Sequence, residues 1–179
     1  MIDFDPALLE KWQRCVNLLA KVVGVPAGLI MRLTGEDIEV FVSSQTAGNP
    51  YKPGDREHFQ DSGLYCEAVI NGGQPLIVPD ALSDPAWKNN PDIKLNMVSY
   101  LGHPILLPSG QPFGTICVLD DKPNPFSETY SNLVMEFRDI IERELALGES
   151  EAKFRKLIEG SIQGILIHRD RKPLLINKA

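Results

Sequence analysis

The stretch from Tyr100 to Asp120 sets the strongest limits on what this chain can fold into. Two apolar runs flank the turn-forming residues Ser109-Gly110-Gln111-Pro112, which predicts a β-hairpin. Neither run alternates strictly between apolar and polar residues, so both faces of the hairpin should be covered. We therefore expect this hairpin at the centre of a sheet with helices packed on it, and Pro104 and Pro108 bracketing its first strand.

The same residues resemble a known family. Tyr100-Leu-Gly-His-Pro-Ile, the turn at Gly110 and Phe113-Gly-Thr-Ile-Cys-Val-Leu-Asp resemble the C-terminal half of a GAF domain, a sensory module of signalling proteins. Leu76-Ile-Val-Pro-Asp-Ala and Asp84-Pro-Ala-Trp fit the same family, so that the resemblance covers roughly Leu8 to Leu147. It implies an α/β fold of the α+β kind, with a central antiparallel sheet of five or six strands and helices on both faces.

Charge and composition exclude several classes of protein. The net charge of -6 argues against a nucleic-acid partner, which needs a concentrated basic face. No apolar run approaches the roughly 20 residues of a membrane span, and the first residues show no secretion signal. Three widely spaced cysteines form neither a metal motif nor a disulfide framework. These features indicate a reduced, cytoplasmic protein.

Helix and strand signals fill the first half of the chain. Asp5-Pro6 predicts a helix start, followed by an apolar stripe at helical spacing that ends at Gly24 and contains Leu8, Trp12, Val16, Leu19 and Val23. That stripe indicates core packing, with pairing to a second copy as the alternative. We expect an outer hairpin of the sheet from strands at 27–33 and 38–44, a loop at 46–61, a short helix at 64–70 and a short strand at 76–78.

The connection from Asp80 to Ser99 is irregular in composition. Asp84-Pro85 and Asn90-Pro91 each repeat the cap-then-proline pattern, which predicts two short helical turns. Long connections inside a compact domain are often functional. In GAF domains this connection commonly covers a ligand cavity against the sheet, an expectation that comes from the resemblance.

A long helix should follow Ser127. Its apolar and glutamate positions alternate in steps of four and three, which is a heptad seam: Leu133, Phe137, Ile140, Glu144, Leu147, Glu151, Phe154 and Ile158. Residues before Ile141 can instead pack on the sheet. Past Leu145 no domain core remains to bury against, so we expect a homodimer through this C-terminal helix.

The tail resembles the opening of a PAS domain, with a first strand at 164–168, a turn at 169–172 and a second strand at 174–177. One hairpin is too little for independent stability. We therefore expect two parts, a GAF-like sensory domain over 1–147 and, over 148–179, a linker helix with a truncated PAS-like segment. The chain would then be a fragment of a longer sensor.

Most catalytic and cofactor chemistries find no motif here. GAF domains that reduce free methionine sulfoxide carry clustered cysteines on the connection at 80–99, and this chain has none there. No Cys-His pair is present for attaching a bilin, and no convincing cyclic-nucleotide signature occurs. The histidines His58, His103 and His168 are far apart, so we expect no metal site and no catalytic residue. No cofactor is indicated.

A binding cavity remains, and aromatic and polar groups on the covering segments are its candidate lining: Tyr65, Cys66, Trp87, Tyr100 and His103. Core packing is the alternative for each of them, above all for Cys66. We expect a non-catalytic sensory domain that binds a small ligand and relays the signal through the C-terminal helix to PAS and output domains, as in two-component systems. The absent output would be a kinase or a cyclic-di-nucleotide enzyme. The alternatives are a ligand-free dimerisation module and, third, a thiol-based reductase in which Cys66 is exposed.

Overall fold

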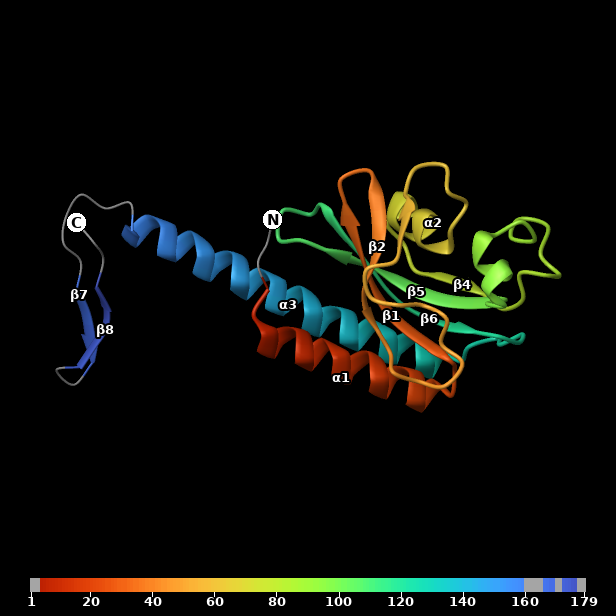
Figure 1. Ribbon diagram of the computed structural model, residues 1–179, viewed down its shortest axis with the longest axis horizontal. Helices are drawn as coiled ribbons and strands as arrows, with labels where there is room; N and C mark the ends of the chain where they lie inside the picture. Colours follow the sequence, from red (N-terminus) through yellow and green to blue (C-terminus); the bar gives the residue numbers. More distant parts are fainter. Residues whose placement is uncertain (1–3, 160–165, 170–171, 177–179) are drawn as a thin grey trace. The chain divides into compact units, whose positions relative to one another are not determined.

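The computed structural model describes residues 4–159, 166–169 and 172–176, and the chain divides into two compact units, Met1–Glu142 and Arg143–Ala179. The first unit is a mixed α/β domain built on a six-stranded antiparallel sheet (Figure 1). Its strands are β1 (Ala27–Thr34), β2 (Asp37–Ser43), β3 (Arg56–His58), β4 (Leu76–Val78), β5 (Ser99–Leu106) and β6 (Pro112–Asp120). The predicted fold class is confirmed.

The order of the strands is β3-β2-β1-β6-β5-β4. The β5–β6 hairpin turns at Gly110, whose φ of 81° lies in the left-handed region that glycine adopts freely. Its register pairs Gly102 with Cys117 and His103 with Ile116. β6 is central and nearly every residue of it is buried, as the continuous apolar run predicts.

Two expectations about the sheet are wrong. The β1–β2 pair is not an outer hairpin, because β1 pairs with β6 at the centre of the sheet. The segment at 46–61 is not wholly a loop, because β3 pairs with β2 and forms the edge. All three residues of β3 are exposed, so this strand carries no apolar pattern from which it could be predicted.

Proline 104 also lies inside a strand rather than before it. Pro104 pairs with Thr115 within β5. β4 reaches only as far as Gly102 along β5, so Pro104 lies where β5 has become an edge strand. A missing backbone donor is tolerated at an edge.

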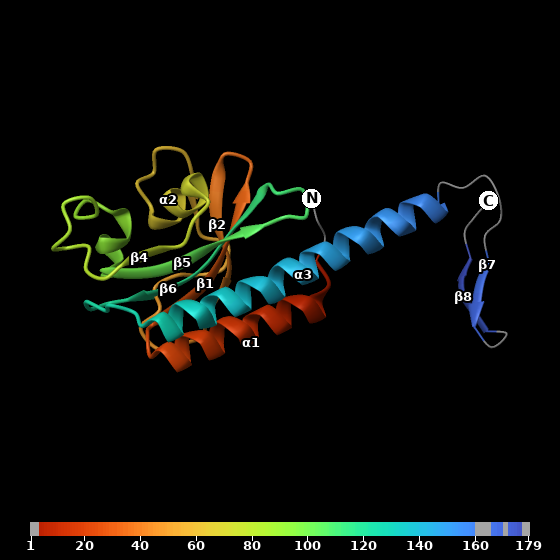
Figure 2. The same ribbon diagram turned by 180° about the vertical axis from the view of Figure 1, so that it is seen from behind.

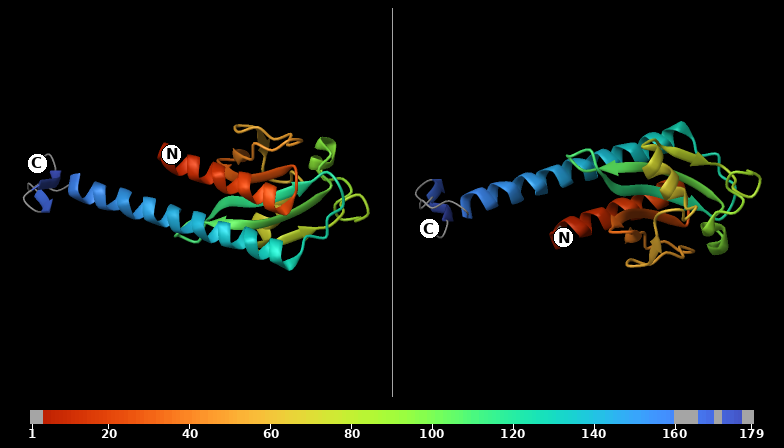
Figure 3. Two further views of the ribbon diagram at one scale, coloured as in Figure 1. Left: turned by 90° about the horizontal axis from the view of Figure 1, so that it is seen from below. Right: turned by 90° about the horizontal axis from the view of Figure 1, so that it is seen from above.

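Two helices lie on one face of the sheet, α1 (Pro6–Val23) and the beginning of α3 (Glu128–Glu159), as Figures 2 and 3 show. Asp5 caps α1 by accepting from the backbone N–H of Ala7, and Gly24 ends the helix in the left-handed conformation. Close packing needs a glycine opposite α1. A Cβ atom on Gly28 would lie 2.8 Å from the carbonyl oxygen of Val16. We call this face the α1 face.

The opposite face is covered by α2 (Tyr65–Gly72) and by the connection at 80–99, and we call it the α2 face. The connection contains both predicted helical turns. One is the 3₁₀ helix η1 (Pro91–Leu95), which Asn90 caps, and the other is closed by the hydrogen bond from Lys88 N–H to the Asp84 carbonyl. Apolar side chains from β1, β2, β5 and β6 form a common core with α2 and this connection.

The second unit contains the end of α3 and a two-stranded antiparallel hairpin, β7 (Leu166–Arg169) and β8 (Lys172–Ile176). The hairpin that the tail predicts is therefore present. The expected first strand begins at 164 and the second ends at 177, and both of these positions lie outside the described residues. Within the described part of the chain, no helix has both the length and the apolar character to span a membrane.

Candidate functional site

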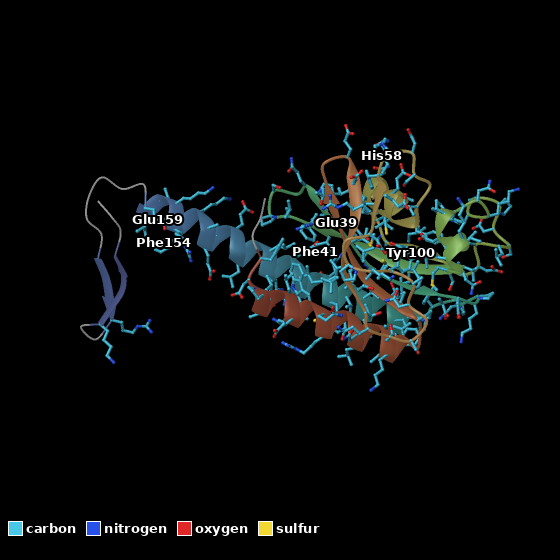
Figure 4. All side chains as sticks on the ribbon, viewed as in Figure 1. Glu39, Phe41, His58, Tyr100, Phe154 and Glu159 are labelled. Atoms are coloured by element: carbon cyan, nitrogen blue, oxygen red, sulfur yellow. The ribbon has the colours of Figure 1, made fainter. Side chains whose placement is uncertain are left out.

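Three aromatic rings from three different elements meet on the α2 face. The ring of Tyr65, at the start of α2, stacks on that of Tyr100 from β5 with centroids 4.8 Å apart, and lies 5.3 Å from the ring of Trp87 in the connection. Tyr65 and Tyr100 are 0% exposed, whereas Trp87 is half-buried. Tyr100 is labelled in Figure 4. The structure therefore brings these three predicted ligand contacts together, and the two tyrosine rings fill the space between α2 and the sheet.

The position of Tyr100 depends on a glycine two residues along the same strand. Side chains two residues apart point to the same face, and a Cβ atom at Gly102 would overlap the phenol of Tyr100. Gly102 thus leaves room for the ring to lie along β5.

Cys66 is the polar centre of this cluster. The Thr115 hydroxyl donates to its Sγ across 3.3 Å, and the Tyr100 hydroxyl lies 3.6 Å from the same sulfur. Hydrogen bonding by the Cys117 thiol lowers the pKa of Cys66 and outweighs its burial, whereas burial raises the pKa of Cys117 well above the usual range of a thiol. Cys66 is 7% exposed, so the exposed thiol that a reductase would need is absent at this position.

A buried acid lies beside the aromatic rings. Asp92 in η1 is 8% exposed, and the hydroxyl of Tyr51 donates to its Oδ1 across 2.7 Å. Burial raises the pKa of Asp92 to about 6, although the hydrogen bond from Tyr51 opposes the shift. Burial also raises the pKa of Tyr51 and of Tyr65, and the charge of Asp92 contributes to both shifts.

The hydroxyl of Tyr65 is buried without a hydrogen-bond partner among the described residues. Such a group costs on the order of 1–3 kcal/mol relative to a hydrogen-bonded one. Perturbed acids and unpartnered polar atoms in one place are typical of functional sites. A carboxyl, an unpartnered phenol and two thiols are therefore buried together on the α2 face, which makes it the candidate site.

His103 lies elsewhere. Tyr100 and His103 are three residues apart on β5, so their side chains point to opposite faces of the sheet. The Nε2 atom of His103 lies 3.3 Å from the hydroxyl of Ser131 in α3, and burial lowers the pKa of His103 to about 4. The expected grouping of His103 with the other four candidates is wrong, because alternation along β5 turns its side chain to the opposite face of the sheet.

Three residues of the site carry no functional signal in the sequence. Tyr51 and Asp92 are 41 positions apart and belong to two irregular segments, so only the tertiary fold brings them together. Asp92 follows the cap-and-proline pair Asn90-Pro91, which predicts a helical turn and nothing about chemistry. Thr115 follows Gly114 in β6 and reads as an ordinary strand residue.

Metal chemistry has no visible basis in the described part of the chain, where no group of three or more His, Cys, Asp or Glu side chains is placed to hold an ion. His58 is exposed on β3, with its Nδ1 atom 3.9 Å from the carboxylate of Asp37 (Figure 4). The backbone of His168 lies in β7 of the second unit.

The predicted heptad seam of α3 is only partly buried. Val134, Ile141 and Leu145 are buried, whereas Leu133, Phe137 and Ile140 are only partly covered. Further along the seam, Leu147 is 61% and Phe154 53% exposed, and Ile158 is buried. The exposed apolar side chains of the seam are therefore Leu147 and Phe154, and glutamates occupy the seam positions before each of them.

No curated protein matches the sequence. Three solved structures of different kinds of protein have a similar fold. The GAF domain from an Acinetobacter phosphoenolpyruvate-protein phosphotransferase has a TM-score of 0.64 and 17% identity, over 82% of this chain and 86% of that one. The free methionine-R-sulfoxide reductase from Neisseria meningitidis has a TM-score of 0.64 and 14% identity, over 80% of each chain. Residues 122 to 287 of a methyl-accepting chemotaxis protein have a TM-score of 0.61 and 17% identity, over 90% of this chain and 95% of that one.

These identities are too low to show more than a common fold. The sequence itself matches the GAF domain family over residues 7–145, which include all six strands of the sheet, α1 and α2. Because that match spans well over half of the chain, the protein belongs to the GAF domain family.

Proposed function

We propose that the chain is a non-catalytic sensory domain, which binds a small ligand on the α2 face and relays the event to α3. The observation that carries this proposal is the construction of β5. On one face it presents Tyr100 to the aromatic cluster, and on the other it presents His103 to Ser131 of α3. A displacement of β5 by a ligand therefore reaches the helix directly.

A second contact joins the end of β5 to the same helix. The backbone N–H of Leu106 donates to the Glu142 carboxylate across 2.7 Å. Together with His103 and Ser131, this contact gives β5 two polar attachments about three helical turns apart on α3. A ligand can bias such a coupled pair only if it binds two arrangements of strand and helix with different affinity.

The ligand contacts in this proposal are Tyr65, Cys66, Trp87 and Tyr100, to which the structure adds Asp92; His103 becomes part of the relay. Because Tyr65 and Tyr100 have no accessible surface, a ligand must displace α2 or the connection at 80–99. The unpartnered hydroxyl of Tyr65 supports a ligand with a hydrogen-bonding group. The chemotaxis protein and the phosphotransferase named above are relatives in which this fold serves larger signalling or regulatory proteins.

The two tryptophans allow a direct test, since Trp12 lies in α1 and Trp87 lies beside Tyr65. The Trp12→Phe variant leaves Trp87 as the only indole. Native mass spectrometry of the protein purified from its own host should show a bound small molecule, and adding that molecule to the stripped Trp12→Phe protein should change the Trp87 emission. The Trp87→Phe variant is the control. An unmodified mass in the native spectrum would contradict the ligand.

The second candidate is a ligand-free dimerisation module, which the close filling of the α2 face by Tyr65 and Tyr100 favours. In both readings the protein is a cytoplasmic homodimer paired along the α3 seam. The Phe137→Glu/Leu147→Glu variant should be monomeric in light scattering, because buried glutamates oppose a helix seam. Leu82 is as exposed as Leu147 but lies in the connection at 80–99. Leu82→Glu is therefore the matched control for the change at Leu147. A dimer that survives the double change would refute the seam.

The proposal extends to the arrangement of domains. The sensory domain would comprise 1–147, and 148–179 would be a linker helix leading into a PAS domain with an output kinase or cyclic-di-nucleotide enzyme beyond it. The β7–β8 hairpin supports this reading, because two strands alone bury too little to be stable.

A further inference from the structure

The thiols of Cys66 and Cys117 come from distant parts of the sequence and share one buried cluster. Cys66 lies on α2 and Cys117 on β6, in the centre of the sheet. Thr115, whose hydroxyl contacts the Cys66 sulfur, lies two residues before Cys117 and on the same face. Tyr100, the other hydroxyl neighbour, lies over Gly102, which is the cross-strand partner of Cys117. Both neighbours thus place the Cys66 sulfur on the face of β6 that carries Cys117, and the Cys117 thiol lowers the pKa of Cys66.

We propose that Cys66 and Cys117 are an oxidisable dithiol, which a hydroperoxide converts into a disulfide that joins α2 to the central strand of the sheet. Both cysteines are free thiols in this structure. The chemistry stands apart from the sensory role proposed above, because the bond can form whether or not the domain relays a signal.

The surroundings assign a role to each thiol. Donation by Thr115 and hydrogen bonding by Cys117 and Tyr100 favour the thiolate form of Cys66, which is the nucleophilic form. Burial keeps Cys117 protonated until the second step. Both residues are buried, Cys66 at 7% and Cys117 at 0% exposure, so the hydrogen-bonding environment and not exposure distinguishes them. Cys66 is therefore the attacking sulfur and Cys117 the resolving one.

The reaction balances with the hydroperoxide as the oxidant. The Cys66 sulfur attacks the peroxide, the O–O bond breaks, and Cys66 becomes a sulfenic acid while the leaving oxygen takes up the thiol proton as water or an alcohol. The Cys117 sulfur then attacks the Cys66 sulfur, the S–O bond breaks, and hydroxide leaves with the Cys117 proton as water. The two thiols lose two protons and two electrons in all, and the peroxide that accepts them is reduced to water, or to water and an alcohol.

The bond would alter the α2 face. A disulfide holds its sulfurs about 2 Å apart, so forming the bond would pull Cys66 of α2 toward Cys117 of β6. Tyr65 is the neighbour of Cys66 in α2 and stacks on Tyr100, which makes the aromatic cluster the part of the domain that responds.

The test uses the full chain and hydrogen peroxide, followed by denaturation, alkylation of the remaining thiols and peptide mass spectrometry. We expect loss of both Cys66 and Cys117 as alkylated peptides and the appearance of one peptide pair linked between them, which dithiothreitol reverses. Cys15, which lies in α1, should still be recovered as an alkylated peptide after peroxide. Cys15→Ser should form the same link as the unchanged protein. Alkylation of both Cys66 and Cys117 after peroxide, or links between chains only, would overturn the proposal.

Two further variants test the assigned roles. In Cys117→Ser the sulfenic acid on Cys66 has no resolving partner, so dimedone should label Cys66. In Cys66→Ser, Cys117 should remain a thiol and dimedone should label neither residue. Labelling of Cys117 in place of Cys66 would overturn the roles. The peptide map of the unchanged protein keeps the dithiol testable even if a variant does not fold.

Discussion

On the α1 face of the sheet the buried carboxylate of Glu39 accepts from two arginines, whereas on the α2 face the buried carboxylate of Asp92 accepts from a phenol. Arg32 and Arg56 both pair with Glu39, and the guanidinium of Arg32 lies 4.1 Å from the centroid of the Phe41 ring (Figure 4). Phe41 in turn contacts the ring of Trp12 in α1. Charge on this face is compensated within a packed aromatic cluster.

The α2 face holds buried polar groups with shifted pKa values, although unpartnered buried atoms occur on both faces, since His103 Nδ1 also has no hydrogen-bond partner among the described residues. The pKa of its acid is raised, its central phenol has no hydrogen-bond partner among the described residues, and the pKa values of its two thiols are shifted in opposite directions. Such groups cost folding free energy, so they are typical of sites that serve binding or chemistry. The two faces of one sheet thus bury their charged and polar groups in different ways, and the predictions below test whether the α2 face is the functional one that we propose.

The largest expected effect is on the α1 face. Trp12→Ala removes a fully buried side chain from the aromatic cluster and should lower the free energy of unfolding by about 3–5 kcal/mol. Urea unfolding followed by circular dichroism measures the loss. Trp87→Ala is the counterpart on the α2 face, and its half-buried ring should cost less. Equal losses would mean that the two faces contribute alike to stability.

A fall in pH should change the stability contributed by Asp92 and that contributed by His103 in opposite directions. The pKa of Asp92 is raised to about 6, so the stability it contributes is present at low pH and is lost as the pH rises through 6. The pKa of His103 is lowered to about 4, so its contribution is present above its unfolded value and is lost as the pH falls through 4. Each contribution is at most about 3 kcal/mol.

Unfolding at several pH values between 4 and 7 measures both effects. Relative to the unchanged protein, Asp92→Asn should gain stability as the pH rises through this window. His103→Gln should gain stability as the pH falls through it. If Asp92→Asn shifts the curve equally at every pH, Asp92 titrates alike in the folded and unfolded protein, and the contrast between the faces fails.

A middle-sized effect is expected at Gly102. Gly102→Ala places a methyl group against the phenol of Tyr100 and should cost about 1–3 kcal/mol by overpacking. The Gly102→Ala/Tyr100→Leu double variant relieves that clash, so its loss should fall short of the sum of the two single losses. Additive losses in a thermodynamic cycle would show that the ring does not occupy the space over Gly102.

The smallest effect should come from the unpartnered phenol. Tyr65→Phe removes a buried hydroxyl that has no partner, so the free energy of unfolding should change by less than about 1 kcal/mol or should rise. Tyr51→Phe is the comparison, because it deprives Asp92 of its donor and should destabilise the protein. A large loss in Tyr65→Phe would reveal a bound partner for this hydroxyl and would strengthen the case for a ligand.

Local sequence signals were sufficient for most of the fold. The cap at Asp5, the glycine stop at Gly24 and the turn at Gly110 each act within a few residues, so their consequences are visible along the chain. The apolar runs in β5 and β6 predict burial on both faces, and the family resemblance supplies the architecture. β3 escaped prediction because an exposed edge strand of three residues has no pattern to detect.

The site depended far more on the tertiary structure. The sequence by itself determined that Tyr65, Cys66, Trp87 and Tyr100 are aromatic or polar groups in segments that cover a sheet, and alternation along β5 already separates Tyr100 from His103. Only the packed fold decided that Tyr51 meets Asp92, that Thr115 and Cys117 meet Cys66, and that Tyr65 has no partner. The physical reason is that these contacts join residues far apart in the chain. Hydrogen bonding and burial of that kind depend on how the layers pack, which local propensity does not record.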